Sequence, residues 1–350
     1  MNLVELLREL VEIESPTGDT GEIQARLEQE LRAVCACVER RGDHLYATIE
    51  GDEPPLLLLG HVDTVWPRGT LARMPFRLDG DRAYGPGTHD MKGGLVVLLE
   101  ALRRTETRHA IRVVVNADEE IGSPDSRSLL AEAADGAVAA FVLEGPAEGG
   151  HLKTARKGIG RFTLTVRGRA AHAATPAEGV SAIEEFAHQV LRLQRLAGHG
   201  VTVNVGLVSG GQTVNTVAPW AKCEIDLRYV TPADREVAMA KITRIIETAH
   251  VPGTSATLAI AGEFKPLVET PDSKRLFEHY AACAKDFGLK VEGEFTGGCA
   301  DSGFTAGVGT PTICAVGPIG GRAHTPDEYL VVDSLVPRAQ TLALAVARLT

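Results

Sequence analysis

The clearest fold signal in this 350-residue chain is the stretch Leu56-Leu57-Leu58-Leu59-Gly60-His61-Val62-Asp63-Thr64-Val65. Four consecutive leucines after Pro54-Pro55 have the length and apolar character of a strand that is buried on both faces. His61 and Asp63 follow the end of this strand, where ligands bind in open α/β sheets. A carboxylate beside an imidazole can orient the ring toward a metal ion. The stretch therefore predicts a buried strand with a candidate functional pair at its end.

Further buried strands follow the first one and alternate with helical segments. Residues 111–115 and 139–143 are almost wholly apolar, and apolar residues at helical spacing occupy 95–102 and 126–134. Strands that alternate with helices in this way are typical of a doubly wound, mostly parallel sheet. We therefore expect an α/β catalytic domain.

The pattern changes between residues 158 and 262. Apolar and polar residues alternate at 162–166, 201–205 and 223–229, helical spacing follows the first and the third of these segments, and a last strand is expected at 256–260. The resulting order βαββαβ predicts a ferredoxin-like α+β sandwich with a polar-faced antiparallel sheet. We expect this domain, residues 158–262, to be inserted into a catalytic domain that comprises residues 1–157 and 263–350.

Composition and charge argue against several classes of binding partner. The formal net charge is −10, and no basic block or stripe suggests binding to nucleic acid. No apolar run has membrane-spanning length, and the charged N-terminal helix does not resemble a signal peptide. The six cysteines show no Cys-x-x-Cys pair and are interpreted as reduced thiols. We expect a cytoplasmic protein without nucleic-acid or membrane partners.

Imidazole and carboxylate side chains recur at or beside the predicted strand ends. They are His61, Asp90, Glu119, Glu120, Glu144 and His324. Taken alone, His61 is readily explained as a structural histidine, and Asp118-Glu119-Glu120 as a solvated acidic loop. Together, four carboxylates at one sheet edge would repel one another unless cations neutralised them.

Two divalent ions that share a bridging carboxylate, about 3.5–4 Å apart, would provide this neutralisation. Histidine and carboxylate ligands without sulfur suit zinc, with cobalt or manganese as substitutes. Glu119 and Glu120 are neighbours and can point in different directions. One of them can bind metal while the other acts as a general base toward the attacking water.

The order of these motifs resembles the two-zinc metallopeptidases of family twenty. The matching segments are Gly60-His61-Val62-Asp63-Thr64-Val65, Tyr84-Gly85-Pro86-Gly87-Thr88-His89-Asp90-Met91-Lys92-Gly93-Gly94, Asp118-Glu119-Glu120, Glu144 and His324. The family includes glutamate carboxypeptidase, acetylornithine deacetylase, succinyl-diaminopimelate desuccinylase and aminoacylase. The resemblance covers nearly the whole chain, and residues 69–77 are most similar to the glutamate carboxypeptidase branch.

The resemblance implies two zinc sites per chain that share one carboxylate. His61 and Glu144 would bind one zinc ion, Glu120 and His324 the other, and Asp90 would bridge the two. A glutamate at position 144 is typical of the deacylases and carboxypeptidases of the family, whereas its aminopeptidases tend to have aspartate there.

The resemblance also implies roles for residues beside the metal ligands. Glu119 would be the general base, and Asp63 would orient His61. The peptide bond between Asp90 and Met91 would be cis, which is rare outside proline.

The segment Arg167-Gly168-Arg169-Ala170-Ala171-His172-Ala173 resembles the lid motif of the family. There, a histidine from the partner subunit completes the active site and stabilises the developing oxyanion. The resemblance therefore implies a homodimer formed through the inserted domain, with His172 as this residue. Without the family, His172 reads as a solvated loop residue.

Four further residues are candidates for binding the substrate. Asn215 lies in a stretch that resembles the family's substrate-contacting asparagine, and Arg228 and Arg156 supply cations suited to a carboxylate. Gly298 would let the backbone approach the substrate closely. The alternative interpretation of Arg228 is a surface strand residue in an ion pair with Asp226 or another neighbour.

We therefore expect a dizinc amidohydrolase that cleaves an N-acyl amino acid or a small peptide with a free C-terminal carboxylate, releasing glutamate. One alternative is an N-acyl-amino-acid deacylase of the acetylornithine deacetylase or succinyl-diaminopimelate desuccinylase type. A second alternative is a binding protein without catalytic activity on the same scaffold.

Overall fold

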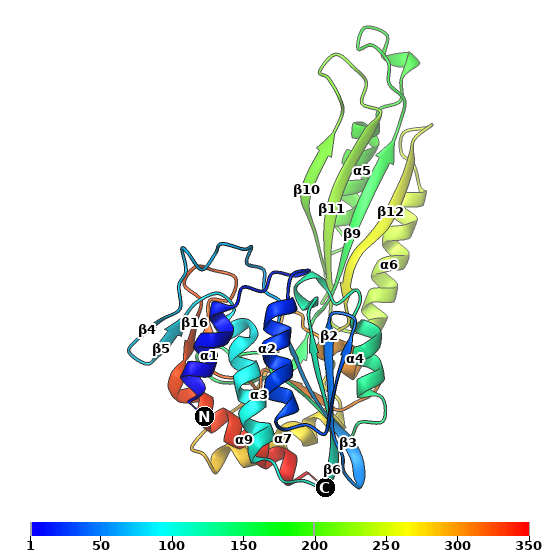
Figure 1. The fold of residues 1–350 in the computed structure, drawn as a ribbon. Helices are drawn as coiled ribbons and strands as arrows, with labels where there is room; N and C mark the ends of the chain where they lie inside the picture. Colours follow the sequence, from blue (N-terminus) through cyan, green and yellow to red (C-terminus); the bar gives the residue numbers. More distant parts are fainter. Residues whose placement is uncertain (1, 199, 350) are drawn as a thin grey trace. The chain divides into compact units, whose positions relative to one another are not determined.

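The computed structural model describes residues 2–198 and 200–349, which divide into two compact units (Figure 1). The first unit contains the chain up to Arg156, residues Leu267–Thr296, and the chain from Ala300 onward. The second unit contains Lys157–Pro266 and Gly297–Cys299. The expected insertion, 158–262, lies within this second unit. The unit also includes 297–299, which the sequence analysis had assigned to the catalytic domain.

An eight-stranded sheet forms the centre of the first unit. Its strands, in spatial order, are β1 (Cys37–Arg41), β2 (His44–Ile49), β6 (His109–Asn116), β3 (Glu53–His61), β7 (Ala139–Val142), β14 (Thr312–Cys314), β8 (Leu152–Arg156) and β13 (Gly293–Thr296). The four strands β6, β3, β7 and β14 pair in parallel, and antiparallel pairs flank them. The predicted doubly wound, mostly parallel sheet is confirmed.

Helices cover both faces of this sheet. They are α1 (Leu3–Glu12), α2 (Gly21–Arg32), α3 (Gly93–Arg104), α4 (Arg127–Ala134), α7 (Pro271–Lys285), α8 (Ser302–Ala306) and α9 (Leu335–Ala347). Figure 1 shows α2 and α3 on one side of the sheet and α4 on the other. Helix α3 is apolar around most of its circumference, which is typical of a helix enclosed by other elements.

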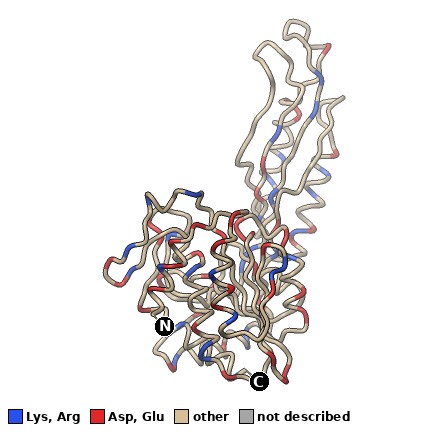
Figure 2. The backbone as a smooth tube through the Cα atoms, viewed as in Figure 1, with Lys and Arg blue, Asp and Glu red and all other residues tan. Residues whose placement is uncertain are grey.

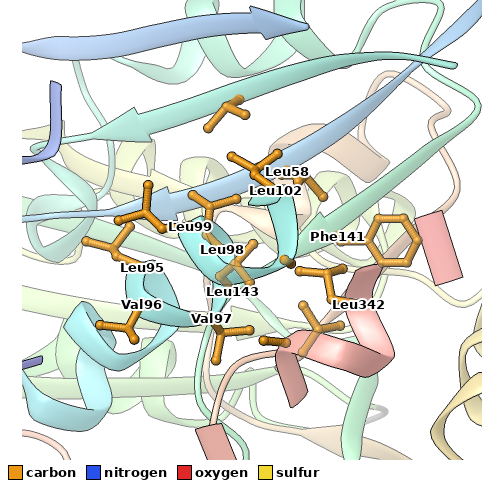
Figure 3. Close-up of a cluster of buried hydrophobic side chains, with 14 of the residues drawn as sticks. Leu58, Leu95, Val96, Val97, Leu98, Leu99, Leu102, Phe141, Leu143 and Leu342 are labelled. Atoms are coloured by element: carbon orange, nitrogen blue, oxygen red, sulfur yellow. The ribbon is translucent and has the colours of Figure 1, made fainter. Parts of the chain in front are cut away.

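The main hydrophobic core surrounds α3. Figure 3 shows Leu95, Leu98 and Leu99 of this helix among side chains from β3, β7 and α9, including Leu58 and Phe141. Burial of these side chains holds the helix against the sheet, and the segment before the helix carries Asp90.

A second, small sheet in the first unit was not expected from the sequence. It contains β15 (Gly320–Gly321), β16 (Tyr329–Val331), β5 (Arg82–Tyr84) and β4 (Arg77–Asp79), in this order. Strands of two or three residues are too short to show an alternating pattern. The sheet joins the segment before Asp90 to the segment after His324, because Tyr84 pairs with Tyr329.

The second unit has the predicted order βαββαβ. Its elements are β9 (Gly158–Arg167), α5 (Ala182–Gln194), β10 (Thr202–Gly210), β11 (Trp220–Tyr229), α6 (Pro232–Glu247) and β12 (Ser255–Phe264). The antiparallel sheet has the order β10-β11-β9-β12, and both helices contact it. A separate core that includes Phe162, Leu164 and Ile242 supports the unit. The predicted α+β insertion is confirmed as a fold.

Acidic and basic residues are interspersed along the backbone of both units, as Figure 2 shows. Within residues 2–198 and 200–349, no helix is both long enough and apolar enough to cross a lipid bilayer.

Candidate metal centre

Strand β3 ends in the first residue of the candidate site. His61 is 1% exposed, and its Nδ1 lies 3.0 Å from the Asp63 carbonyl oxygen and 3.4 Å from Asp63 Oδ1. Because both of these atoms are acceptors, Nδ1 carries the ring proton and Nε2 keeps its lone pair in the neutral ring. Nε2 faces Asp90 Oδ1 at 3.2 Å and Glu144 Oε1 at 3.8 Å.

The fully buried Asp63 carboxylate also holds the turn that carries the two adjacent glutamates. The Glu119 amide donates to Oδ1 and the Glu120 amide to Oδ2, each at 3.1 Å. Thr17 Oγ1 adds a hydrogen bond of 2.7 Å to Oδ2. One carboxylate therefore positions both the His61 ring and the Glu119-Glu120 turn.

Asp90 lies between the two histidines of the site. Its Oδ1 is 3.2 Å from His61 Nε2, and its Oδ2 is 3.2 Å from His324 Nε2. The Asp90–Met91 peptide bond is cis, which confirms that prediction. Two oxygens that face different imidazoles are the arrangement needed for a carboxylate that bridges two cations.

Two groups of potential ligand atoms share Asp90. The first contains His61, Asp90 and Glu144, and the second contains Asp90, Glu120 and His324. Within each group, the ligand atoms lie within 4.8 Å of one another, and His324 Nε2 is 3.2 Å from Glu120 Oε2. The structure thus brings together all five residues expected to bind zinc.

The residues present fit a pair of divalent cations. Glu120 Oε1 is buried and has no hydrogen-bond partner within the part of the chain that the structure describes. A buried carboxylate oxygen without a partner is costly unless a cation binds it. Nitrogen and oxygen ligands without thiolate suit zinc, cobalt or manganese.

The pKa shifts of the site residues also indicate that positive charge is needed here. Burial raises the pKa of Glu144 to about 7, and the nearby Asp90 charge adds to this shift. Hydrogen bonds to Asp90 and Glu120 raise the pKa of His324 to about 10. The carboxylates of the cluster therefore require bound protons or metal cations to balance their charge.

Glu119 belongs to neither ligand group among the described residues, although it is adjacent to Glu120. Its side chain is 8% exposed, and it interacts electrostatically with His61 and Glu144. Burial, together with the charges of Asp301 and Glu144, raises the pKa of Glu119 well above its ordinary value. A carboxylate that is close to the ligands and is not itself one of them suits proton transfer.

In the second unit, the segments that carry His172 and Asn215 lie side by side. His172 forms an antiparallel bridge with Thr216, and the Ala173 amide donates to the Asn215 carbonyl oxygen at 2.9 Å. Both His172 and Asn215 are exposed. His172 Nδ1 accepts a hydrogen bond of 3.1 Å from the Ala174 amide, so Nε2 carries the proton in the neutral ring.

Arg228 forms an ion pair with Asp226, as the alternative interpretation of this residue predicts. Its Nε lies 2.9 Å and its Nη2 3.4 Å from the two Asp226 carboxylate oxygens, and Nη1 donates to the Gly297 carbonyl oxygen at 2.8 Å. Gly298 belongs to the same unit, whereas Arg156 ends β8 in the first unit.

Comparison with known proteins identifies the family. Residues 57–348 match Peptidase family M20/M25/M40. Carboxypeptidase G2 from Pseudomonas sp. (strain RS-16) is 32% identical, covering 97% of this chain and 87% of the relative. The chain belongs to the M20/M25/M40 peptidase family.

This M20 chain is also similar to a deacylase and to a further carboxypeptidase. Acetylornithine deacetylase from Proteus mirabilis (strain HI4320) is 26% identical over 87% of this chain and 82% of the relative. An M20 metallo-carboxypeptidase, Sso-CP2 from Sulfolobus solfataricus, has the same fold, with a TM-score of 0.81, 16% identity and 99% coverage of both chains. The M20 chain is thus a metallohydrolase of the class that cleaves peptides and N-acyl amino acids.

Sequence reasoning missed a buried network behind the M20 site. The Asp118 carboxylate accepts hydrogen bonds from the Asp125 and Ser126 amides, at 2.8 and 3.1 Å, at the start of α4. Asp301 accepts from Asn116 Nδ2 at 2.7 Å and from Ser123 Oγ. This network fixes the loop after β6, and only the placement of Asp118 beside the two glutamates hinted at it.

Glu328 was also missed, although it is 1% exposed and contacts the segment that carries Asp90. In the sequence, Thr325-Pro326-Asp327-Glu328 reads as a solvated loop. The one available signal is the apolar run that begins immediately after Glu328.

Proposed function

We propose that this protein is a dizinc carboxypeptidase that hydrolyses the amide bond of an N-acyl amino acid or small peptide with a free C-terminal carboxylate, releasing glutamate. The observation that carries the proposal is the pair of ligand groups that share Asp90, with Glu119 beside them. The similarity to carboxypeptidase G2 over 97% of the chain supports the carboxypeptidase branch.

The five ligands would divide between two zinc ions. His61 and Glu144 would bind one ion, Glu120 and His324 the other, and Asp90 both. Bound zinc supplies Lewis acidity, which polarises the scissile carbonyl group and stabilises negative charge in the transition state.

The chain's own residues would position and move the proton. Glu119 would take a proton from the attacking water and later deliver it to the nitrogen of the leaving amine, so that the carboxylate is regenerated. Asp63 would keep Nδ1 of His61 protonated and would hold the backbone amides of Glu119 and Glu120. The buried environment would reduce competition from bulk water for this proton.

We assign the remaining roles from the sequence: those of Asn215 and His172 from the resemblance, and those of the two arginines and Gly298 from their chemistry. Arg228, with Asn215 or Arg156, would bind the substrate carboxylate, and Gly298 would allow a close backbone approach. His172 of a partner subunit would donate a hydrogen bond to the developing oxyanion in a homodimer. The Nε2–H tautomer of His172 supports this donor role.

Hydrolysis of a panel of N-acyl amino acids, folate-type conjugates and peptidyl glutamates by zinc-loaded protein tests the proposal. The expected result is a strong preference for substrates with a C-terminal glutamate. The Glu119→Ala variant should lose this hydrolysis while it retains zinc. Cleavage without this preference would contradict the glutamate assignment. Absence of cleavage with both zinc ions bound would contradict catalysis and favour a binding protein.

The 26% identity to an acetylornithine deacetylase supports a second candidate, an N-acyl-amino-acid deacylase. The same panel distinguishes the two candidates, because a deacylase would prefer an acylated diamine such as acetylornithine.

A further inference from the structure

A second buried carboxylate, at Glu328, contacts the backbone beside the shared ligand. Glu328 Oε1 accepts hydrogen bonds from the His89 amide at 2.9 Å and the Asp90 amide at 3.1 Å. Its Oε2 accepts from the Gly87 amide at 3.1 Å and from Trp66 Nε1 at 3.3 Å. The side chain is 1% exposed, so these four donors replace the water that a carboxylate would otherwise bind.

The small sheet places Glu328 at this position. Strands β16 and β5 are antiparallel, and Tyr329 pairs with Tyr84. Glu328 therefore precedes one strand at the point where Gly85 follows the other. The chain then turns around the carboxylate at Gly87, whose φ of 74° lies in the left-handed region that favours glycine. A Cβ at Gly87 would come within 2.7 Å of Thr64 Cγ2.

The segment that contains Glu328 also supplies His324. The Glu328 amide donates to the Thr325 carbonyl oxygen at 3.1 Å, which closes a short turn after this histidine. One five-residue segment thus carries a candidate ligand at its start and holds the backbone of the shared ligand Asp90 at its end. Glu328 thus connects the segment that carries His324 to the backbone of Asp90.

We propose that Glu328 is a positioning residue of the two-metal site: it fixes the backbone amides of His89 and Asp90, so that the two Asp90 oxygens face separate cations. The inference rests on the proposed metal site and extends it to a residue outside the ligand set. The Asp90 oxygens lie 3.2 Å from their two histidines, so a small movement of this backbone would change both contacts.

Zinc affinity of the Glu328→Gln variant tests the inference directly. A glutamine has only one acceptor oxygen. Its NH₂ group would therefore face one of the two pairs of N–H donors, to which it cannot act as an acceptor. Loss of residues that orient metal ligands typically costs about 10- to 100-fold in metal affinity. We expect a loss of this size at the weaker zinc site, measured by competition with a chromophoric chelator.

Two further readouts separate positioning from general stability. The Co²⁺-substituted variant should show an altered visible absorption spectrum, because the ligand geometry changes. Excess zinc should restore its metal occupancy, which it would not do if the variant had simply unfolded. Circular dichroism of the chelator-treated protein reports whether the fold is retained.

Glu185→Gln is the matched control. Glu185 is 0% exposed, and its Oε2 accepts from the His250 and Val251 amides, each at 2.7 Å, in the second unit. This variant removes a comparable buried acceptor, and its zinc affinity should equal that of the wild type.

Zinc affinity within twofold of the wild type in a folded Glu328→Gln variant would overturn the inference. If this variant does not fold, Glu328→Asp provides the test, because it keeps the charge and shortens the reach. Unchanged zinc affinity in a folded Glu328→Asp variant would also overturn it. Two bound zinc ions without hydrolysis of any substrate would overturn the proposed function alone, whereas a wild type that binds no divalent cation would overturn both.

Discussion

At the scale of single residues, the adjacent glutamates of the site differ in their surroundings although their chemistry is the same. Glu120 Oε2 faces His324 at 3.2 Å, whereas Glu119 is in neither ligand group of the described chain. The backbone amides of both glutamates donate to the Asp63 carboxylate, so one buried side chain fixes the positions of both residues. The difference in role follows from direction, since consecutive side chains of a short turn point apart.

Replacing Glu119 by glutamine should separate catalysis from metal binding. The change keeps the size of the side chain but removes the proton acceptor, so kcat should fall about 10²- to 10⁴-fold. Zinc content, measured by atomic absorption, should stay at the wild-type value. Glu120→Gln should instead lower zinc affinity, and a Glu119→Gln variant with wild-type kcat would contradict the general-base role.

Replacing Asp63 by asparagine should weaken metal binding without removing a ligand. The asparagine side chain carries no negative charge to balance the proton on His61 Nδ1. It also offers one acceptor oxygen, whereas the Glu119 and Glu120 backbone amides need two. We expect about a 10- to 100-fold loss of zinc affinity in a chelator competition. Thr17→Val removes one hydrogen bond to the same carboxylate and should have a smaller effect. Equal effects of the two changes would argue against the orienting role.

At the scale of elements, close approach of α3 to the strand ends brings the ligand-bearing segments together. A Cβ at Gly94 would lie 2.1 Å from the carbonyl oxygen of Leu143, the residue before Glu144. A Cβ at Gly93 would meet Leu330 Cδ1 of β16 at 2.1 Å. Gly94 therefore allows close backbone packing against β7's continuation, and Gly93 leaves room for the Leu330 side chain.

The Gly94→Ala variant should be less stable by about 1–3 kcal/mol, because its methyl group would overlap a backbone atom that cannot move independently. Urea unfolding followed by circular dichroism measures the change. Gly21→Ala is a suitable control, since a Cβ there meets nothing within 4 Å at the start of α2. A Gly94→Ala variant as stable as this control would show that the helix can shift without cost.

At the scale of the whole molecule, buried acidic groups make the stability of the metal-free protein depend on pH. Burial raises the pKa of Glu144 and of Glu328 to about 7, and that of Asp301 to about 6. Between about pH 4 and 7, these three groups therefore bind more protons in the folded state than in the unfolded chain. The contribution of each group is complete below its ordinary pKa and is lost as the pH rises through its folded-state pKa.

Chelator-treated protein should therefore lose stability between about pH 5 and pH 7. Each unit by which a pKa is raised corresponds to at most about 1.4 kcal/mol. The midpoint of urea unfolding at several pH values measures the trend. Saturating zinc should oppose it, because cations stabilise the ionised carboxylates and bind the folded state selectively. Stability that rises with pH in the metal-free protein would contradict the assigned shifts.

Much of the fold was predictable because the local pattern of apolar and polar residues indicates which positions are buried. The leucine run after Pro54-Pro55, the alternating segments of the insertion and the order βαββαβ all reflect which faces are covered. The candidate ligands were predictable because they lie at strand ends or in the segments beside them, and the family resemblance added the cis bond at Asp90. Periodicity and motif order therefore predicted the architecture, the family and the five candidate ligands.

Tertiary structure decided which polar residues hydrogen-bond to the segments that carry the candidate ligands. Glu328 and Asp301 lie more than 170 positions from the residues that they hold, and the apolar run after Glu328 is the one local feature that sets it apart from a solvated carboxylate. The small sheet was not predictable because its strands have only two or three residues each. Hydrogen bonds between distant segments depend on how the chain returns to the same place, and this is set by packing of the whole unit.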